Sequence, residues 1–430
     1  MPIRFIDFFA GAGGLSEGFI KAGYTPIAHV EMKKDACNTL KTRAAFHYLR
    51  EQNRLDIYEN YLRNKRERTD GAELWRQVPA EVTNRVIQET IGENTMAPLL
   101  NRLDALAGGE PVDIIIGGPP CQAYSIAGRA KMGKDVKSDP RNYLYRYYLQ
   151  FIGHFSPKMF VFENVMGITT AQTVDMVKPF DDLRRIEDEM GYEVEAHEQI
   201  ASDYEVLQHR HRMIIVGWKR EDDNHNPTQY HYPDLVKVVN RYKTRTDIFA
   251  DLPERKNGDG KLCEIVHYTR PLEEMKYLEK TGIRGVFDFT TQHVTRNNNE
   301  RDREIYCIAI KEWKHKRRLN YSTLPDRLKT HKNTSSFLNR FSVVDPHGCC
   351  HTVVAHIAMD GHYYIFPSNE PTIENARSIS VREAARLQSF PDDYFFEGSR
   401  TSVYMQIGNA VPVMMSYHIA EALRPQLEEE

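Results

Sequence analysis

One cysteine of the chain, Cys121, follows a sequence that is typical of a catalytic nucleophile. Cys121 follows Gly117-Gly118-Pro119-Pro120, in which two glycines allow a sharp bend and two prolines fix the backbone just before the thiol. The apolar run 112–116 predicts a buried strand, and open α/β sheets bind ligands at the carboxyl ends of their strands. A small buried loop cysteine is the alternative. Four restricted residues ahead of one thiol favour the nucleophile.

Two further groups could assist such a thiol. Glu163 ends a second apolar run, 159–162, and a carboxyl group beside a cysteine on the next strand suits a proton donor or hydrogen-bond partner. A strand-end acid that faces water is the alternative reading of Glu163. Further on, Gln208, Arg210 and Arg212 alternate along an extended segment, which points all three side chains to one side.

The N-terminal residues predict a ligand site of their own. A strand at 4–9, a glycine turn at 10–14 and a helix at 15–22 form the unit that brings a ligand close to backbone amides. Ser16 stands where the third glycine of the dinucleotide fingerprint belongs, so the turn is not that fingerprint. The next strand ends at Glu31, and an acid there suits ribose hydroxyls. A plain tight turn with a solvated glutamate is the alternative.

Composition limits the class of protein. The 430 residues can form one large domain and a smaller one, and 57 Lys and Arg nearly balance 60 Asp and Glu. Six cysteines without a repeated C-x-x-C spacing, and an N-terminus without a signal peptide, predict a reduced, cytosolic compartment. No apolar run approaches the roughly 20 residues of a membrane span.

The strand and helix pattern is interrupted twice. Residues 41–100 predict a helical insertion with solvated charged faces, and from about 219 to 375 the chain is polar and irregular. Within the latter, 311–332 holds eight Lys and Arg against two acids, which is typical of a nucleic-acid footprint, with a solvated basic helix as the alternative. The run 347–351 (His-Gly-Cys-Cys-His) predicts no zinc site, because adjacent cysteines are poor chelators.

Taken together, the motifs resemble those of the DNA (cytosine-5) methyltransferases. Six segments match the family in its order: Asp7-Phe8-Phe9-Ala10-Gly11-Ala12-Gly13-Gly14, Gly118-Pro119-Pro120-Cys121-Gln122, Glu163-Asn164-Val165, Gln208-x-Arg210-x-Arg212, Arg386-Leu387-Gln388-x-Phe390-Pro391 and Gln406-x-Gly408-Asn409. The resemblance implies an α/β fold with two parts. A Rossmann-like S-adenosylmethionine-dependent methyltransferase domain would span 1–218 and be completed by 376–430, with the last helix beside the first strand. A smaller, irregular target recognition domain would span 219–375 and face the major groove.

The resemblance also implies which residues bind the cofactor, S-adenosylmethionine, and the DNA. Phe9, Gly11 and Gly14 would line the cofactor, Glu31 would take its ribose, and Asp104 would meet the adenine amino group. The remaining cofactor residues would be Met32, Pro120, Leu144 and Asn409. Met32 departs from the bulky aromatic residue expected against adenine. The DNA-binding residues would be Gln122, Ser125 and Arg129 after the cysteine, and Lys314, Arg317 and Arg318 in the basic segment.

The implied reaction is methylation of carbon 5 of a flipped-out cytosine. Cys121 would attack carbon 6, Glu163 would neutralise charge at ring nitrogen 3, and Arg212 would hold the carbonyl oxygen, with Arg210 steadying the site. The expected partners are double-stranded DNA and a separate restriction endonuclease. The chain would act as a monomer in the cytoplasm of a prokaryote, associated with the nucleoid. A tRNA cytosine methyltransferase remains an alternative. A catalytically silent DNA-binding module would be expected to lose Cys121 or Glu163.

Overall fold

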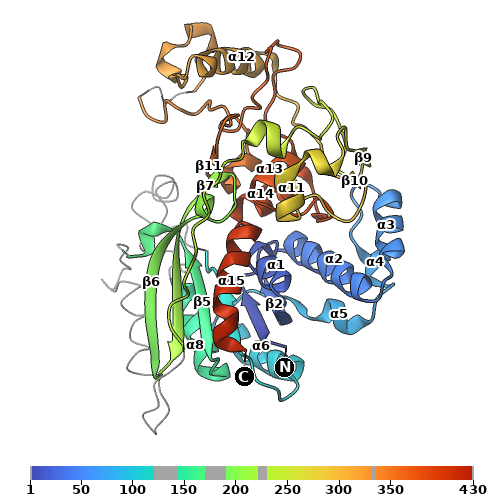
Figure 1. Cartoon of the computed structure of the whole chain (residues 1–430), viewed down its shortest axis with the longest axis vertical. Helices are drawn as coiled ribbons and strands as arrows, with labels where there is room; N and C mark the ends of the chain where they lie inside the picture. The colour runs from blue at the N-terminus through green and yellow to red at the C-terminus, as the bar shows by residue number, and fades with distance from the viewer. Residues whose placement is uncertain are drawn as a thin grey trace.

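The computed structural model describes residues 2–120, 143–169, 190–220, 230–331, 333 and 335–428. Its central element is one open sheet with the strand order β3-β2-β1-β4-β5-β8-β6 (Figure 1). The strands are β1 (Arg4–Phe8), β2 (Thr25–Glu31), β3 (Val86–Gln88), β4 (Ile114–Gly117), β5 (Met159–Asn164), β6 (Tyr192–Ile200) and β8 (His211–Lys219).

The strand order reverses in the middle of the sheet, and this sets where a ligand is expected. Strands β1 to β5 run parallel, whereas β8 pairs antiparallel with both β5 and β6. From β1 the chain moves outward to β2 and β3, and then returns to the other side of β1 with β4 and β5. In open α/β sheets the crevice outside the carboxyl ends of the strands at such a reversal takes the ligand.

Helices cover both faces of the sheet. Two clusters of buried side chains lie on the sheet. In β1, Ile6 and Phe8 belong to the first cluster and Phe5 belongs to the second. Strands that are buried on both faces are apolar throughout, as the runs 112–116 and 159–162 predict. The first cluster lies under α6 (Glu93–Ala107) and α8 (Leu144–Phe155), and the second under α1 (Gly14–Lys21) and α15 (Val413–Leu427). Among the described residues, no helix has the length and apolarity needed to cross a membrane.

The last helix, α15, packs against the first. Ser416 Oγ donates a hydrogen bond to the Leu15 carbonyl, and a Cβ on Gly18 would lie 2.5 Å from the Ser416 side chain. Beyond α1, the Tyr24 hydroxyl donates to the Ala420 carbonyl at 2.9 Å. The neighbour of α15 is thus α1, while Phe5 of the first strand belongs to the same buried cluster.

The segment 41–100, expected to be a helical insertion, also carries the edge strand β3. A strand of three residues among charged side chains gives little period-two signal, which is why the sequence pattern does not predict it. The charged side chains are also not all solvated, because Lys65 and Glu397 form a buried ion pair. The helices here are α2 (Lys34–Glu51), α3 (Leu55–Asn64), α4 (Ala72–Trp75) and α5 (Ala80–Asn84).

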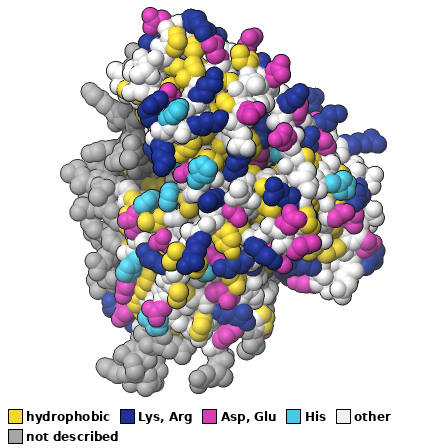
Figure 2. Space-filling model, turned by 45° about the horizontal axis from the view of Figure 1, so that its top comes forward, with side chains coloured by type: hydrophobic (Ala, Val, Ile, Leu, Met, Phe, Trp, Pro, Cys, Tyr) yellow, Lys and Arg dark blue, Asp and Glu magenta, His cyan; other side chains and the backbone are white. Residues whose placement is uncertain are grey.

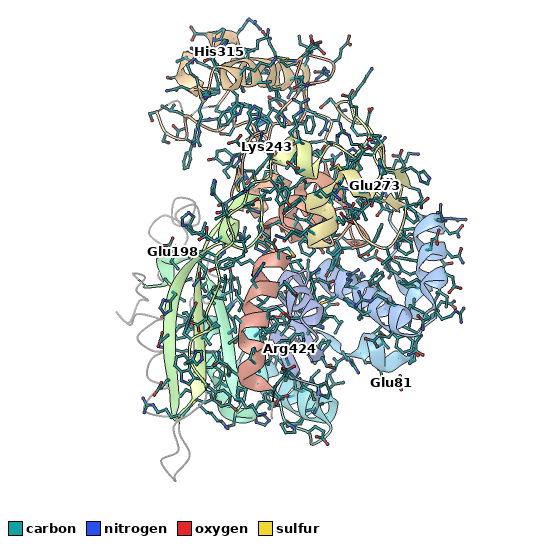
Figure 3. All side chains as sticks on the ribbon, in the orientation of Figure 1. Glu81, Glu198, Lys243, Glu273, His315 and Arg424 are labelled. Carbon is teal, nitrogen blue, oxygen red and sulfur yellow. The ribbon has the colours of Figure 1, made fainter. Side chains whose placement is uncertain are left out.

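An irregular block, residues 230–375, stands over the carboxyl edge of the sheet (Figure 1). The parallel pair β7 (Gln208–His209) and β11 (Cys350–His351) joins it to the sheet. Farthest out is the α12 lobe (residues 300–343), which has its own buried cluster and carries His315 in Figure 3. The other elements above the sheet are α11 (Lys276–Thr281), α12 (Glu300–Lys314), β9 (Val266–His267) with β10 (Phe289–Thr290), and the later helices α13 (Val381–Leu387) and α14 (Arg400–Asn409).

Candidate active site

A carboxylate and a guanidinium group meet at the carboxyl end of β5. Glu163 Oε1 lies 2.5 Å from Arg212 Nε, and each side chain is 13% exposed. The sheet register places them together, because Glu163 is opposite Ile214 of β8, two residues after Arg212. Glu198, near the corresponding end of β6, marks this edge of the sheet in Figure 3. Two adjacent strands therefore hold the Glu163–Arg212 pair on the side of the sheet that faces the irregular block.

The turn that precedes Cys121 packs against Glu163. A Cβ on Gly118 would lie 2.8 Å from Glu163 Oε2, so a glycine leaves room for the carboxylate. Asn164 Nδ2 donates to the Pro119 carbonyl at 3.4 Å and ties the same turn to the end of β5. Pro120 is exposed. The other predicted site residues of this loop lie outside the described residues: Cys121, Gln122, Ser125 and Arg129.

The alternation predicted for 208–212 is present, but Arg210 has a structural task. Gln208 and Arg210 are buried, whereas His209 between them is exposed. Arg210 Nη1 donates to the Val353 carbonyl at 2.7 Å, and Gln208 Oε1 accepts from the Val353 amide at 2.8 Å. Burial and the neighbouring Arg212 charge hold the pKa of Arg210 well below its usual value. Arg210 thus ties the segment next to Arg212 to the irregular block through the Val353 carbonyl.

At the other end of the crevice, the tip of β2 meets the glycine turn. The Gly11 amide donates to Glu31 Oε2 at 2.9 Å, and the Lys33 amide donates to Glu31 Oε1 at 2.8 Å. Phe9 and Gly11 both have positive φ angles, of 58° and 56°. A carboxylate oxygen has two lone pairs, so each oxygen of Glu31 can accept a further hydrogen bond. The turn is therefore fixed on Glu31, which keeps acceptor capacity for a ligand hydroxyl.

Gly14 is the first residue of α1, and because it has no side chain, another segment of the chain can pack directly against it. A Cβ at this position would collide with the Val411 carbonyl and lie 3.0 Å from the Ala410 side chain. The chain between α14 and α15 thus passes directly over the first turn of α1. Any contact of Gly14 with a cofactor would therefore come from its backbone.

Three other predicted cofactor residues lie near this edge. Met32, directly after Glu31, is 55% exposed. Asn409 is exposed at the end of α14, and that helix reaches the start of α2 through Met405, whose Sδ lies 3.6 Å from Lys33 Nζ. Leu144 is half-buried at the first position of α8. The side chains of Met32 and Asn409 are thus both exposed to solvent.

The structure places Asp104 away from this group. It lies in the last turns of α6, which leads back to the amino ends of the strands, and it pairs there with His154 at 2.9 Å. We therefore leave Asp104 out of the proposed cofactor site. Glu89 follows the carboxyl end of β3 instead, and its amide donates to the Glu31 carbonyl at 3.0 Å. Recognising Val86–Gln88 as a strand would have pointed to Glu89.

The basic segment divides into groups with different surroundings. Lys314, at the end of α12, donates to the Asn369 carbonyl, and Arg317 Nε lies 2.7 Å from Glu312 Oε2. Arg318 is exposed. The pKa of His351 is lowered to about 4, mainly by burial, and the positive charge of Arg318 adds to this effect. The C-terminal end of α12 therefore lies within electrostatic range of β11.

The carboxyl edge of the sheet has a glycine turn with Glu31 at one end of the crevice and the Glu163–Arg212 pair at the other. Together with the fold, these features define the protein as a Rossmann-like methyltransferase. The chain belongs to the C-5 cytosine-specific DNA methylase family, whose model matches residues 3–67 and 100–424. It is therefore a DNA cytosine-5 methyltransferase. The unmatched residues 68–99 include β3, the strand that the sequence pattern did not predict.

Curated relatives match along almost the whole chain. The type II methyltransferase M.Bpa9945I of Bacillus paralicheniformis is 40% identical, and the match covers 97% of this chain and 98% of the relative. The type II methyltransferase M.DdeI of Desulfomicrobium norvegicum is 28% identical over 98% of this chain and 88% of the relative.

Solved structures show the same fold at low identity. A DNA modification methyltransferase encoded within an E. coli prophage aligns with a TM-score of 0.59 and 20% identity, covering 99% of this chain and 100% of the other. The Entamoeba histolytica methyltransferase EhMeth aligns with a TM-score of 0.52 and 14% identity, covering 100% of both chains. These likenesses support the fold.

Proposed function

We propose that the chain takes the methyl group from S-adenosylmethionine and adds it to a cytosine that is flipped out of the duplex and held covalently by Cys121. The observation that carries this proposal is the Glu163–Arg212 pair, which lies against the turn leading to position 121. A nucleophile, a carboxyl group and a fixed cation at one edge are what attack on a pyrimidine ring requires. The ring atoms are hidden inside a duplex, so the base must leave the stack at a cost of a few kcal/mol.

The edge formed by β1 and β2 fits the proposed cofactor. A Cβ on Gly11 would meet no atom within 4 Å, so there is open space directly above the turn. Glu31 faces that turn and suits the two ribose hydroxyls, while exposed Met32 offers an apolar surface for the adenine. Glu89 replaces Asp104 as the candidate partner of the adenine amino group. S-adenosylmethionine supplies the methyl group when it is bound.

The residues at the other end then carry the base chemistry. The Cys121 thiolate forms a bond to carbon 6, which pushes electron density to carbon 5 and makes that carbon nucleophilic. Glu163 neutralises the charge that develops at ring nitrogen 3, and Arg212 holds the carbonyl oxygen while it orients Glu163. After carbon 5 gains the methyl group, loss of its proton expels the Cys121 sulfur and restores the aromatic ring.

A fluorine at carbon 5 tests this sequence of steps, because it leaves no proton to remove. A duplex containing 5-fluorocytosine at the methylated position should therefore remain covalently attached to wild-type protein and migrate with it on a denaturing gel. The Cys121→Ser variant should form no such complex, while it still binds S-adenosylmethionine in calorimetry. A covalent complex of equal yield with Cys121→Ser would rule out Cys121 as the nucleophile. Tritiated methyl transfer to duplex DNA and to tRNA, compared in parallel, tests the tRNA alternative.

The proposal extends to the biological setting. Two relatives that match nearly the whole chain are type II methyltransferases, which favours the modification half of a restriction-modification system, with residues 219–375 as the target recognition domain. Bisulfite sequencing of DNA from cells that express the chain should reveal one methylated sequence. DNA from these cells should then resist the cognate endonuclease. We also propose that the enzyme acts as a monomer, which light scattering of the purified protein with and without DNA would test.

A further inference from the structure

We infer that Phe337 helps to read the target sequence: its ring makes an apolar contact with a base edge of the recognised duplex. The inference rests on the proposed role of residues 219–375 in DNA recognition and names one of its specificity-determining residues. No motif singles out Phe337, and it lies outside the predicted basic segment 311–332.

Phe337 is an unusual surface residue in this protein. Its side chain is 62% exposed, and no other phenylalanine or tryptophan in the described ranges is exposed. Leaving a ring of this size in water forgoes the favourable burial of apolar surface.

The loop that carries Phe337 is held in place by its own hydrogen bonds. Asn333 Oδ1 accepts from the amides of Ser335 and Ser336, at 3.1 and 2.9 Å. Arg340 then donates to the carbonyls of Asn333 (2.7 Å), Ser336 (2.8 Å) and Phe337 (3.0 Å). The guanidinium group also lies 4.2 Å from the centroid of the Tyr321 ring. Arg340 is thus engaged inside the loop, and the loop presents Phe337 without having to be ordered on binding.

The backbone of Phe337 supports the same conclusion. Its φ is +54°, in the left-handed region that a bulky side chain rarely adopts. Such a conformation is strained and persists where the surrounding structure imposes it. Here the carbonyl of the strained residue is the one that Arg340 Nε binds. The residue with the strained backbone is thus the same residue whose ring is exposed, Phe337.

A chain of contacts connects this loop to the catalytic edge. Asn339 Nδ2 donates to the Tyr363 hydroxyl at 3.3 Å, and the ring of Tyr363 lies 4.4 Å from that of His351. His351 of β11 pairs with His209 of β7, three residues before Arg212. The Phe337 loop is therefore fixed to the same end of the sheet as the Glu163–Arg212 pair.

The charge of the α12 lobe identifies the partner as nucleic acid. Residues 300–343 contain 11 Lys and Arg against five Asp and Glu. Figure 2 shows Lys and Arg side chains, interspersed with Asp and Glu, on the upper part of the molecule next to exposed hydrophobic side chains. Phosphates would be met by those cations, whereas a phenyl ring has neither charge nor donor to offer them. Its partner in the major groove is the methyl group of thymine, which distinguishes one base pair from another.

The test uses the full-length protein with two duplexes: one carries the sequence mapped by bisulfite sequencing, and the other carries that sequence scrambled. Phe337→Ala should weaken binding to the mapped duplex by roughly 10- to 150-fold, because the ring loses its buried apolar contact, and leave the scrambled duplex almost unaffected. The slope of log affinity against log salt should not change, because no phosphate contact is lost. Phe337→Trp should keep most of the affinity, and its indole fluorescence should change when DNA is added. Val286→Ala, at another exposed apolar side chain (55% exposed), is the matched control and should change neither affinity.

Two outcomes would overturn the inference while leaving the proposed function intact. One is affinity of Phe337→Ala for the mapped duplex within twofold of wild type. The other is an equal loss on both duplexes with a flatter salt slope, which would mean that the loop faces phosphates. If wild type itself neither methylates nor binds DNA selectively, the proposed function fails instead. Cofactor affinity and thermal unfolding of each variant verify that the fold is unchanged.

Discussion

Replacing Lys65 with methionine should destabilise the protein far more than the loss of an ordinary ion pair. Lys65 Nζ lies 2.9 Å from Glu397 Oε2, and the two side chains are only 3% and 1% exposed. Without Lys65, the Glu397 carboxylate would remain buried with the Thr42 and Tyr61 hydroxyls as its donors. Removing one partner of a buried pair typically costs about 3–5 kcal/mol, a large share of the roughly 5–15 kcal/mol that holds a domain together.

Denaturant unfolding of three variants checks this magnitude. Lys65→Met should lower the free energy of unfolding by about 3–5 kcal/mol, and adding Glu397→Gln should recover most of the loss, because a neutral amide oxygen still accepts from the two hydroxyls. Arg54→Met removes an ion pair of similar geometry, to Asp56, whose side chains are 57% and 60% exposed, and it should leave the stability almost unchanged. If Lys65→Met were no worse than Arg54→Met, the Lys65–Glu397 pair would not be buried in solution.

Three further predictions concern separate parts of the molecule. Glu31→Ala should weaken S-adenosylmethionine binding in calorimetry, since it also removes the acceptor of the Gly11 amide; unchanged affinity would place the cofactor elsewhere. Burial lowers the pKa of His293 from 6.5 to about 4, so the folded protein favours the neutral imidazole. This contribution to the free energy of unfolding is complete above pH 6.5 and is lost as the pH falls towards 4. Unfolding measured across this window should show about 3 kcal/mol of pH dependence that His293→Gln lacks. Arg318→Ala should flatten the salt dependence of DNA binding by about 0.9 per lost phosphate contact. Arg317→Ala should flatten it less, because Arg317 already pairs with Glu312, and equal slopes would contradict this reasoning.

Sequence reasoning was most successful where a local pattern and a motif agreed. The alternation at 208–212 predicts that Gln208 and Arg210 point the same way, and the structure buries both. The position of Glu31 follows equally directly from the length of the second strand, which ends at that residue. In these cases a single element determines the direction of the side chain, so no long-range contact has to be known.

Where tertiary contacts decide the outcome, the sequence was insufficient. Arg210 has the residue type of a catalytic group, but its partner is the Val353 carbonyl, 143 residues away. Asp104 was assigned to the cofactor site by its position in the family pattern alone. The helix that carries it, α6, leads back to the amino ends of the strands, away from that site. The presentation of Phe337 depends on hydrogen bonds within its own loop, and no periodicity in the chain encodes them.

The packing of α15 on α1 also bears on how the enzyme is synthesised. About 400 residues separate the two helices, and a ribosome that adds roughly 5–20 residues per second needs about 20–80 s to cover that interval. Until α15 emerges, Leu15 and Phe19 of α1 lack the apolar partners that α15 supplies to their buried cluster, among them Met415 and Ile419. The glycine turn also lacks the cover that Val411 provides over Gly14. Nascent chains, and translation products that stop before α15, should therefore bind no methyl donor, so that only completed molecules modify the genome.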